Sequence, residues 1–374
     1  FYVVASSYSH VLYGYTVQAS KEDDQALKIT PLFIFKAHTQ CIRTLAGRNC
    51  WLLSGSDDES IKVYRLDKKK ETGTLLLHNG SVGSLEFIAE DKKTSSKWAL
   101  SGAEDGKIIL WRIHDWQPLL IINAHKESHT IHYSPVIAPH PSGKLALSIG
   151  SMCELKMWDL TNGKCSFRKT LPRSERSTPW LVKGQMNSKG RELPIQLEWN
   201  PSGTAYTVLF PSHAISYNVE SDQTLFQIED EQLLMKMIYL SDDFIVISGD
   251  AGIITIFKTD GTKIRSIQAH KLRIKGLGTA PYESVHSSST DKLPYLISTA
   301  SDGTINIWDS NILCQNGDSD DISPTGSVDT KDRITALSIS YPFNLSGSKR
   351  RREEIEEEEE DEIEEEPVEE EEQK

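Results

Sequence analysis

The stretch LSGAEDGKIILW, residues 100–111, places a serine at the end of an apolar run and a tryptophan ten residues later. The same spacing, a Ser or Thr followed after ten residues by an aromatic residue, occurs four more times along the chain. The five pairs are Ser54 and Tyr64, Ser101 and Trp111, Ser148 and Trp158, Thr207 and Tyr217, and Ser298 and Trp308. Weaker copies are Ser248 with Phe257, one residue short, and Ala5 with Tyr15, which lacks the hydroxyl. Five matches at one spacing indicate an internal repeat.

Each repeat has the pattern of a β-hairpin. Between its two anchor residues lies a turn signal, such as Asp105-Gly106 or Asp302-Gly303, flanked by alternating apolar residues, and this arrangement is typical of paired antiparallel strands. The anchor aromatics from Tyr64 to Trp308 are 40 to 59 residues apart. That length accommodates four strands, which is the size of one propeller blade.

Four repeats also carry a histidine upstream of the hydroxyl residue. A buried indole N–H needs an acceptor, a serine hydroxyl can accept it and donate onward to a histidine, and the second ring nitrogen can bond an aspartate of the turn. We call this series a polar network and expect it to stiffen the blade. The expected networks are His78, Ser101, Asp105 and Trp111; His270, Ser298, Asp302 and Trp308; His38, Ser54 and Asp58 with Tyr64; and His125, Ser148 and Trp158, where Met152 replaces the aspartate and leaves the network incomplete.

The Ser, His and Asp composition of these networks also matches a hydrolase triad. A catalytic nucleophile, however, occurs once in an exposed cleft, whereas these groups recur at fixed spacing beneath an aromatic ring. The sequence also contains no H-E-x-x-H, no G-x-x-x-x-G-K-[ST] and no G-x-G-x-x-G motif. We therefore predict no enzymatic activity and no cofactor. The loosely spaced His129 and His132 have no neighbouring carboxylate or thiolate, so we expect a surface pair instead of a metal site.

The repeats account for a closed ring. Six anchor aromatics from Tyr64 to Trp308, together with the N-terminal strands, supply seven blades. The last apolar strand, residues 333–342, has no hairpin of its own, and pairing it beside the N-terminal strands removes both open edges. The sequence therefore predicts an all-β, seven-bladed β-propeller over residues 1–342, closed by its N- and C-terminal strands, followed by a disordered acidic tail over residues 343–374.

The formal net charge of −13 is concentrated in that tail, because residues 349–374 contain 16 acidic and five basic side chains. Such a run of like charges repels itself and stays solvated, whereas the nearly neutral remainder can bury a core. The five cysteines are scattered and never form a C-x-x-C pair, which argues against a disulfide framework or a zinc ribbon and favours a reducing, intracellular compartment. No apolar run approaches the roughly 18 residues that cross a bilayer, so we expect no membrane partner.

The pattern of His, Ser, Asp and Trp-Asp resembles the WD-repeat superfamily across residues 1–342. Within it, LSGAEDGKIILW, HPSGKLALSIG with MWDLTNGKCSFRK, WNPSGTAY and IQAHKLRIKG resemble the PAK-interacting WD-repeat proteins, a family that includes the fungal maintenance-of-killer proteins. The resemblance implies a non-catalytic nuclear or nucleolar factor for assembly of the large (60S) ribosomal subunit. It also implies a second theme, the binding and restraint of p21-activated kinases. We expect a monomer within a larger complex that docks a ribosomal-protein-like factor and pre-rRNA.

Propellers bind partners with the loops and channel mouth of one face, and the most unusual loop here spans residues 168–191. It carries seven basic residues and one acidic residue: Arg168, Lys169, Arg173, Arg176, Lys183, Lys189 and Arg191 against Glu175. With Trp180 among them, these side chains could hold phosphates while the indole stacks on a base or fills a protein pocket. The alternative is a surface loop whose charges only keep it soluble.

Two further charged segments are candidate contacts. Lys271, Arg273 and Lys275 directly follow His270, where we expect the innermost strand to emerge, so they either rim the channel or form an ordinary charged strand edge. The patch Lys349, Arg350, Arg351 and Arg352 is typical of a nuclear import signal. The glutamates that follow would attract basic proteins such as unassembled ribosomal proteins or histones, or serve only as a solubility tail.

Overall fold

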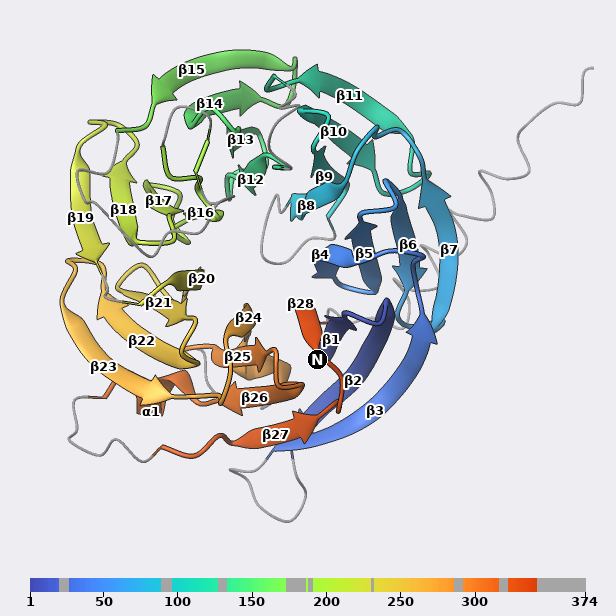
Figure 1. Ribbon diagram of the computed structural model, residues 1–374, viewed down its shortest axis with the longest axis vertical. Helices are drawn as coiled ribbons and strands as arrows, with labels where there is room; N and C mark the ends of the chain where they lie inside the picture. The colour runs from blue at the N-terminus through green and yellow to red at the C-terminus, as the bar shows by residue number, and fades with distance from the viewer. Residues whose placement is uncertain are drawn as a thin grey trace, which may run out of the picture. The chain divides into compact units, whose positions relative to one another are not determined.

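Seven four-stranded antiparallel sheets surround a central axis (Figure 1). The structure, a computed structural model, describes residues 1–19, 27–88, 96–126, 133–172, 186–187, 191–229, 232–285, 292–315 and 322–341. The predicted all-β, seven-bladed propeller is confirmed. Residues 342–374, which hold the predicted import patch and acidic tail, lie outside the described residues.

We number the blades in chain order and give the strands of each from the axis outward. Blade 1 contains β28 (Ile334–Ser340), β1 (Tyr2–Ser7), β2 (Val11–Ala19) and β3 (Leu27–Lys36). Blade 2 contains β4 (Ile42–Arg48), β5 (Trp51–Ser56), β6 (Ile61–Arg65) and β7 (Lys70–Leu75). Blade 3 contains β8 (Val82–Ile88), β9 (Trp98–Ala103), β10 (Lys107–Arg112) and β11 (Pro118–Asn123). Blade 4 contains β12 (Val136–Pro139), β13 (Leu145–Ile149), β14 (Glu154–Asp159) and β15 (Lys164–Thr170).

The remaining blades follow the same order. Blade 5 contains β16 (Gln196–Trp199), β17 (Ala205–Leu209), β18 (His213–Asn218) and β19 (Thr224–Glu229). Blade 6 contains β20 (Leu234–Tyr239), β21 (Phe244–Gly249), β22 (Ile253–Lys258) and β23 (Lys263–Gln268). Blade 7 contains β24 (Ile274–Ala280), β25 (Tyr295–Ala300), β26 (Thr304–Trp308) and β27 (Gly326–Asp329), with η1 (Tyr282–Ser284) and α1 (Ser310–Leu313) in its connections.

The ring closes in blade 1, where the last described strand pairs with the first. β28 runs antiparallel to β1, with Val4 opposite Ser338. The Tyr8 backbone N–H also donates to the Arg333 carbonyl at 2.8 Å. The predicted pairing of the N- and C-terminal strands of the propeller is therefore confirmed, and it gives blade 1 the same four strands as the other blades.

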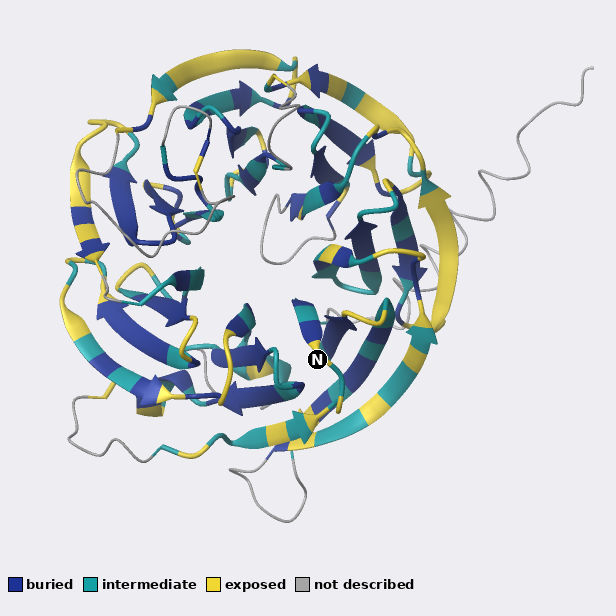
Figure 2. Cartoon of the chain, in the orientation of Figure 1, coloured by how far each residue is buried: buried dark blue, intermediate teal, exposed yellow. Residues whose placement is uncertain are grey.

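The hydrophobic core lies between neighbouring blades. One cluster joins Leu53 and Val63 of blade 2 to Phe87 and Trp111 of blade 3. The outermost strands are the most exposed part of each blade (Figure 2). At six of the seven anchor aromatics the outer strand skips one residue in its register, as where Trp111 lies opposite Pro118. A bulge of this kind bends and twists a strand, so the outer strand curves at the position of the bulky ring.

Three further findings bound the chemistry of the described residues. All five cysteines are free. Within the described part, no group of His, Cys, Asp or Glu side chains is arranged to hold a metal ion. No helix there has the length and apolar character needed to pass through a membrane.

Candidate functional site at the channel mouth

In blade 3 the polar network runs from the interior to the surface turn. The Trp111 indole N–H donates to Ser101 Oγ at 2.8 Å, and Ser101 Oγ lies 2.7 Å from His78 Nε2. The Asp105 carboxylate can only accept, so His78 Nδ1–H donates to it at 3.2 Å, and Nε2 of the neutral ring then accepts the Ser101 hydroxyl. Asp105 also accepts the backbone N–H of Asn79 at 3.1 Å. The network thus joins β9 and β10 to the connection that precedes β8.

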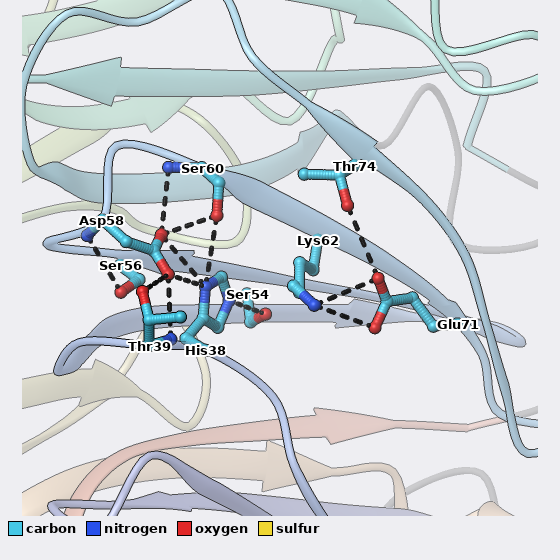
Figure 3. Close-up of polar contacts among 9 residues, drawn as sticks. All are labelled: His38, Thr39, Ser54, Ser56, Asp58, Ser60, Lys62, Glu71 and Thr74. Carbon is cyan, nitrogen blue, oxygen red and sulfur yellow. Dashed lines mark hydrogen bonds and ion pairs between the residues drawn. The ribbon is translucent and has the colours of Figure 1, made fainter.

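Blade 2 contains the variant with tyrosine. Figure 3 shows its histidine, serine and aspartate: His38 lies 2.7 Å from Ser54 Oγ through Nε2 and 2.9 Å from Asp58 Oδ2 through Nδ1. Burial alone would raise the pKa of Asp58, but hydrogen bonds from Ser60 and the neighbouring His38 outweigh it and lower this pKa to about 2. Tyr64 is buried in the core. The carboxylate therefore stays ionised and holds the turn in place.

Blade 7 differs from the sequence-based expectation in one contact. His270 Nε2 lies 2.7 Å from Ser298 Oγ, which accepts the Trp308 indole at 2.9 Å. Its Nδ1, however, lies 2.6 Å from Thr304 Oγ1, and Asp302 is 3.9 Å away. The Thr304 hydroxyl donates to Asp302 at 2.6 Å. A hydroxyl group therefore relays between the histidine and the carboxylate, where we expected direct contact.

Blade 4 lacks the carboxylate. His125 Nε2 lies 2.8 Å from Ser148 Oγ, and the Trp158 indole donates to the same oxygen at 2.8 Å. Met152 occupies the turn position of the aspartate. Burial, with a smaller contribution from the positive charge of Lys156, lowers the pKa of His125 to about 3. The ring is therefore neutral at physiological pH and acts only as a structural link.

Blade 5 carries a different buried network that the sequence did not reveal. Both oxygens of the buried Glu192 accept hydrogen bonds of 2.7 Å from Ser212, one from its backbone N–H and one from its hydroxyl. His213 Nδ1 lies 2.7 Å from the same hydroxyl. Thr207, the anchor hydroxyl, lies 2.5 Å from Tyr239 of blade 6. Glu192 precedes the inner strand β16, at the place where other blades have a histidine. This position was the only sign in the sequence that Glu192 takes part in a polar network.

The seam in blade 1 is held by an aspartate from the C-terminal strand connection. Asp332 accepts the Ser9 hydroxyl at 2.5 Å and the Tyr13 hydroxyl at 3.2 Å. The Arg333 guanidinium lies 5.5 Å from the centroid of the Tyr8 ring. Side chains from both ends of the propeller therefore meet at this face.

The predicted loop contacts divide into described and undescribed residues. Lys169 forms an ion pair of 2.6 Å with Asp222 and lies 4.2 Å from the Tyr217 ring centroid, so it ties blade 4 to blade 5. Arg191 donates to the Leu171 carbonyl at 3.2 Å. Arg168 on β15 is exposed. Outside the described residues lie Arg173, Arg176, Trp180, Lys183 and Lys189, together with His129, His132, Lys349, Arg350, Arg351 and Arg352.

The second basic cluster lies beside the channel. Lys271 and Arg273 are exposed directly before β24, and Lys275 is half-buried on that strand. Burial and the neighbouring cations Arg273, Arg333 and Lys236 lower the pKa of Lys275. The sequence indicated the first three residues but not Arg333 or Lys236, because strands distant in sequence bring these together.

A β-bulge near the start of the inner strand recurs in five blades. The register between inner and second strand skips one residue there: Arg43, Gly83, Met235, Lys275 and Thr335. Bulges re-aim a side chain relative to a regular strand. The bulge residues of blades 2 and 7 are cations, and Arg43 forms an ion pair of 2.7 Å with Asp57.

Acidic residues line another part of the channel. A cavity of about 370 Å³ is bordered by Glu86 on β8, Glu198 on β16 and Lys236 on β20, with Arg43 and Glu104 nearby. Glu86 lines this cavity, and the surrounding protein raises its pKa to about 8, with the neighbouring Glu198 adding to the effect. Enclosure also raises the pKa of Glu198 to about 7. The channel therefore has a basic and an acidic side.

The closed ring of seven blades, with Trp–Ser–His networks repeated under a common spacing, defines a WD-repeat β-propeller. The WD40 family, described as "WD domain, G-beta repeat", matches residues 29–65 and 261–309. The chain therefore contains WD40 repeats within a seven-bladed propeller.

Several known proteins are similar to this chain, some over most of its length and one over less than half of it. The "p21-activated protein kinase-interacting protein 1-like" protein of Gallus gallus is 29% identical over 338 residues, which cover 90% of this chain and 79% of the relative. "Shk1 kinase-binding protein 15" of Schizosaccharomyces pombe is 24% identical over 82% of this chain and 76% of the relative. "Protein MAK11" of Saccharomyces cerevisiae is 37% identical over 40% of this chain and 38% of the relative. The resemblance predicted from the sequence is confirmed by these homologues.

Proposed function

We propose that this protein is a non-catalytic docking platform for assembly of the large (60S) ribosomal subunit in the nucleus and nucleolus. In this role it binds a ribosomal-protein-like assembly factor and pre-rRNA on the propeller face that carries the channel mouth, as a monomer within a larger complex. The similarity to the yeast MAK11 protein supports the proposal, as does the resemblance of the repeats to the maintenance-of-killer proteins.

The channel mouth is the observation that carries the docking role. Lys275, Arg273 and Arg333 lie together, and within the described residues no carboxylate forms an ion pair with them. Gathered like charges without counterions store unfavourable electrostatic energy, which a bound partner of opposite charge relieves. The repeated Ser–His pairs, in contrast, are consumed by the blades and offer no free nucleophile.

Two charged segments of the sequence add nuclear import, binding of basic proteins and contact with RNA to this proposed role. The patch Lys349 to Arg352 directs the chain to the nucleus, and the acidic residues after it, in a tail over residues 343–374, hold basic proteins by charge. Arg168 and the basic residues that follow it contact pre-rRNA phosphates.

Depletion of the protein tests the ribosomal role. We expect a deficit of large subunits and accumulation of unprocessed large-subunit rRNA, measured by sucrose-gradient profiles and RNA blots. Re-expression of the full chain should restore both. Normal subunit profiles after complete depletion would contradict the proposal.

A second candidate function is binding and negative regulation of a p21-activated protein kinase. It is favoured by the names of the relatives from Gallus gallus and Schizosaccharomyces pombe, which denote kinase interaction and kinase binding. The purified full chain should then bind a purified kinase regulatory segment directly and lower kinase activity. An empty pull-down with purified components would remove this candidate without affecting the first.

A further inference from the structure

The basic side of the channel mouth is built from two adjacent inner strands. Gly276 on β24 lies so close to Leu337 on β28 that an added Cβ would be 2.3 Å from the Leu337 Cβ. The absence of a side chain at Gly276 therefore allows the two strands to approach. As a result Lys275, the bulge residue of β24, lies near Arg333, which immediately precedes β28.

Exposed apolar and aromatic groups accompany these cations. Tyr8, in the turn between β1 and β2, is 61% exposed and faces Arg333. Leu272, between Lys271 and Arg273, is 52% exposed. Tyrosine and arginine dominate the residues that contribute most to protein–protein binding, whereas isolated surface charges contribute little.

The acidic side of the same channel is formed by Glu86 and Glu198, which border the cavity of about 370 Å³. Glu198 accepts one hydrogen bond of 3.0 Å from Gln196. Within the described residues Glu86 accepts no hydrogen bond, although it faces the channel. Lys236 connects the two sides, because it lies near both glutamates and near Lys275.

This division of charge restricts the occupant. A nucleic acid backbone is uniformly negative and offers no cation to Glu86 and Glu198, whereas an entering lysine or arginine would favour the ionised form of both carboxyl groups, whose pKa the surrounding protein raises. A uniformly basic segment of a protein would be repelled by Lys275 and the cations beside it. Only a polypeptide can place acidic and basic side chains a few residues apart and add apolar contacts beside them.

We propose that the channel mouth binds a segment of a partner protein that carries both charge signs. Its acidic side chains contact Lys275, Arg273 and Arg333, an apolar side chain covers Leu272 and Tyr8, and a lysine or arginine enters the cavity lined by Glu86 and Glu198. This inference rests on the proposed docking role. It leaves pre-rRNA to Arg168 and the basic residues that follow it, and not to the channel mouth itself.

A photo-crosslinking amino acid at Leu272, in the full chain that replaces the native copy in cells, tests the proposal. Mass spectrometry of the adduct should identify a protein segment in which Asp or Glu residues lie within a few residues of a Lys or Arg. The double substitution Arg273→Glu with Lys275→Glu should lower the yield of this adduct about tenfold, and Glu86→Lys should lower it similarly. Lys164→Glu, an exposed cation on the outer strand β15, is the matched control and should leave the yield unchanged.

Four outcomes of this experiment would overturn the proposal. They are an RNA adduct, an adduct with a protein segment whose charges are all of one sign, no adduct at all, and an adduct yield that the charge reversals leave unchanged. Lys275→Gln and Glu86→Gln, checked for cooperative thermal unfolding, keep the test valid if a charge reversal misfolds. If the reversals abolish the adduct but large-subunit profiles stay normal, the docking site stands and the ribosomal role fails. A subunit deficit on depletion, without a protein adduct, removes only the docking site.

Discussion

Blades 3 and 4 have the same interior half of the polar network and different outer halves. In blade 3 the indole–serine and serine–histidine distances are 2.8 and 2.7 Å, and in blade 4 both are 2.8 Å. Beyond the histidine, blade 3 continues to Asp105, whereas blade 4 has Met152. The tryptophan, serine and histidine thus form a structural unit that does not depend on the carboxylate. The aspartate is a separate addition that fixes the surface turn.

Removing the shared half should have the largest effect. Trp111→Ala and Trp158→Ala each empty a buried aromatic site, so we expect each to lower the free energy of unfolding by about 3–5 kcal/mol. Urea denaturation of the two variants measures this. Trp111→Phe, which keeps most of the ring volume, should cost less than half as much. A large loss in one blade and a loss under about 1 kcal/mol in the other would show that the halves are not equivalent.

Removing the outer half of the network, which blade 3 has and blade 4 lacks, should have a smaller effect. Asp105→Ala leaves His78 and the backbone N–H of Asn79 without their acceptor, which should cost about 2–3 kcal/mol. At the equivalent position of blade 4, Met152→Leu should change stability by less than about 1 kcal/mol, because the swap conserves volume. Equal losses for these two variants in urea denaturation would contradict a separate role for the aspartate.

The sequence predicted the parts of this architecture that depend on local spacing. The Ser101 to Trp111 interval and the turn signals between such anchors identify seven blades because strand alternation and hairpin chemistry act over about ten residues. The partner of the last strand was predictable because an unpaired edge is unfavourable. Met152 predicted the incomplete network of blade 4, because the position of the aspartate in each repeat is also set by local spacing.

The sequence did not predict other contacts, because these join residues that do not recur at a fixed spacing. Thr304 stands two residues after its aspartate, as Ser60 does in blade 2, and a hydroxyl at that position was the available signal for a relay. Glu192 meets Ser212 across 20 residues with no counterpart in other blades. Lys169 was predicted to contact a partner, and its bond to Asp222 depends on how blades 4 and 5 pack.

The two blades should also respond to acid in different pH ranges. Burial lowers the folded-state pKa of His125 to about 3, so between about pH 6.5 and 3 the unfolded chain binds a proton that the folded chain does not. Stability therefore falls as pH falls through this range, with a slope of up to about 1.4 kcal/mol per pH unit. Burial would raise the pKa of Asp105, but the His78 hydrogen bond and backbone N–H donors outweigh it, so this pKa is lowered. Its contribution is complete above about pH 4 and is lost only below that value.

Unfolding free energies measured from pH 7 to 3 separate these two contributions. His125→Gln should flatten the curve between about pH 6.5 and 4, whereas Asp105→Asn should change its slope only below about pH 4. His114→Gln, at an exposed histidine on the connection between β10 and β11, is the matched control substitution. If His125→Gln leaves the slope above pH 4 as in the wild type, the histidine of blade 4 is not held neutral by burial.

Completing the network in blade 4 should have the smallest effect on stability and the clearest spectroscopic signature. Met152→Asp places a carboxylate at the position that Asp105 occupies in blade 3, and an opposite charge beside an imidazole favours its protonated form. We expect the pKa of His125, followed by NMR titration of its ring, to rise by about 1–3 units, while the free energy of unfolding at pH 7 changes by less than about 1 kcal/mol. Met152→Leu should leave the pKa where it is. An unchanged pKa in Met152→Asp would mean that the turn of blade 4 holds position 152 away from the ring, so that the two blades differ in backbone geometry and not only in one side chain.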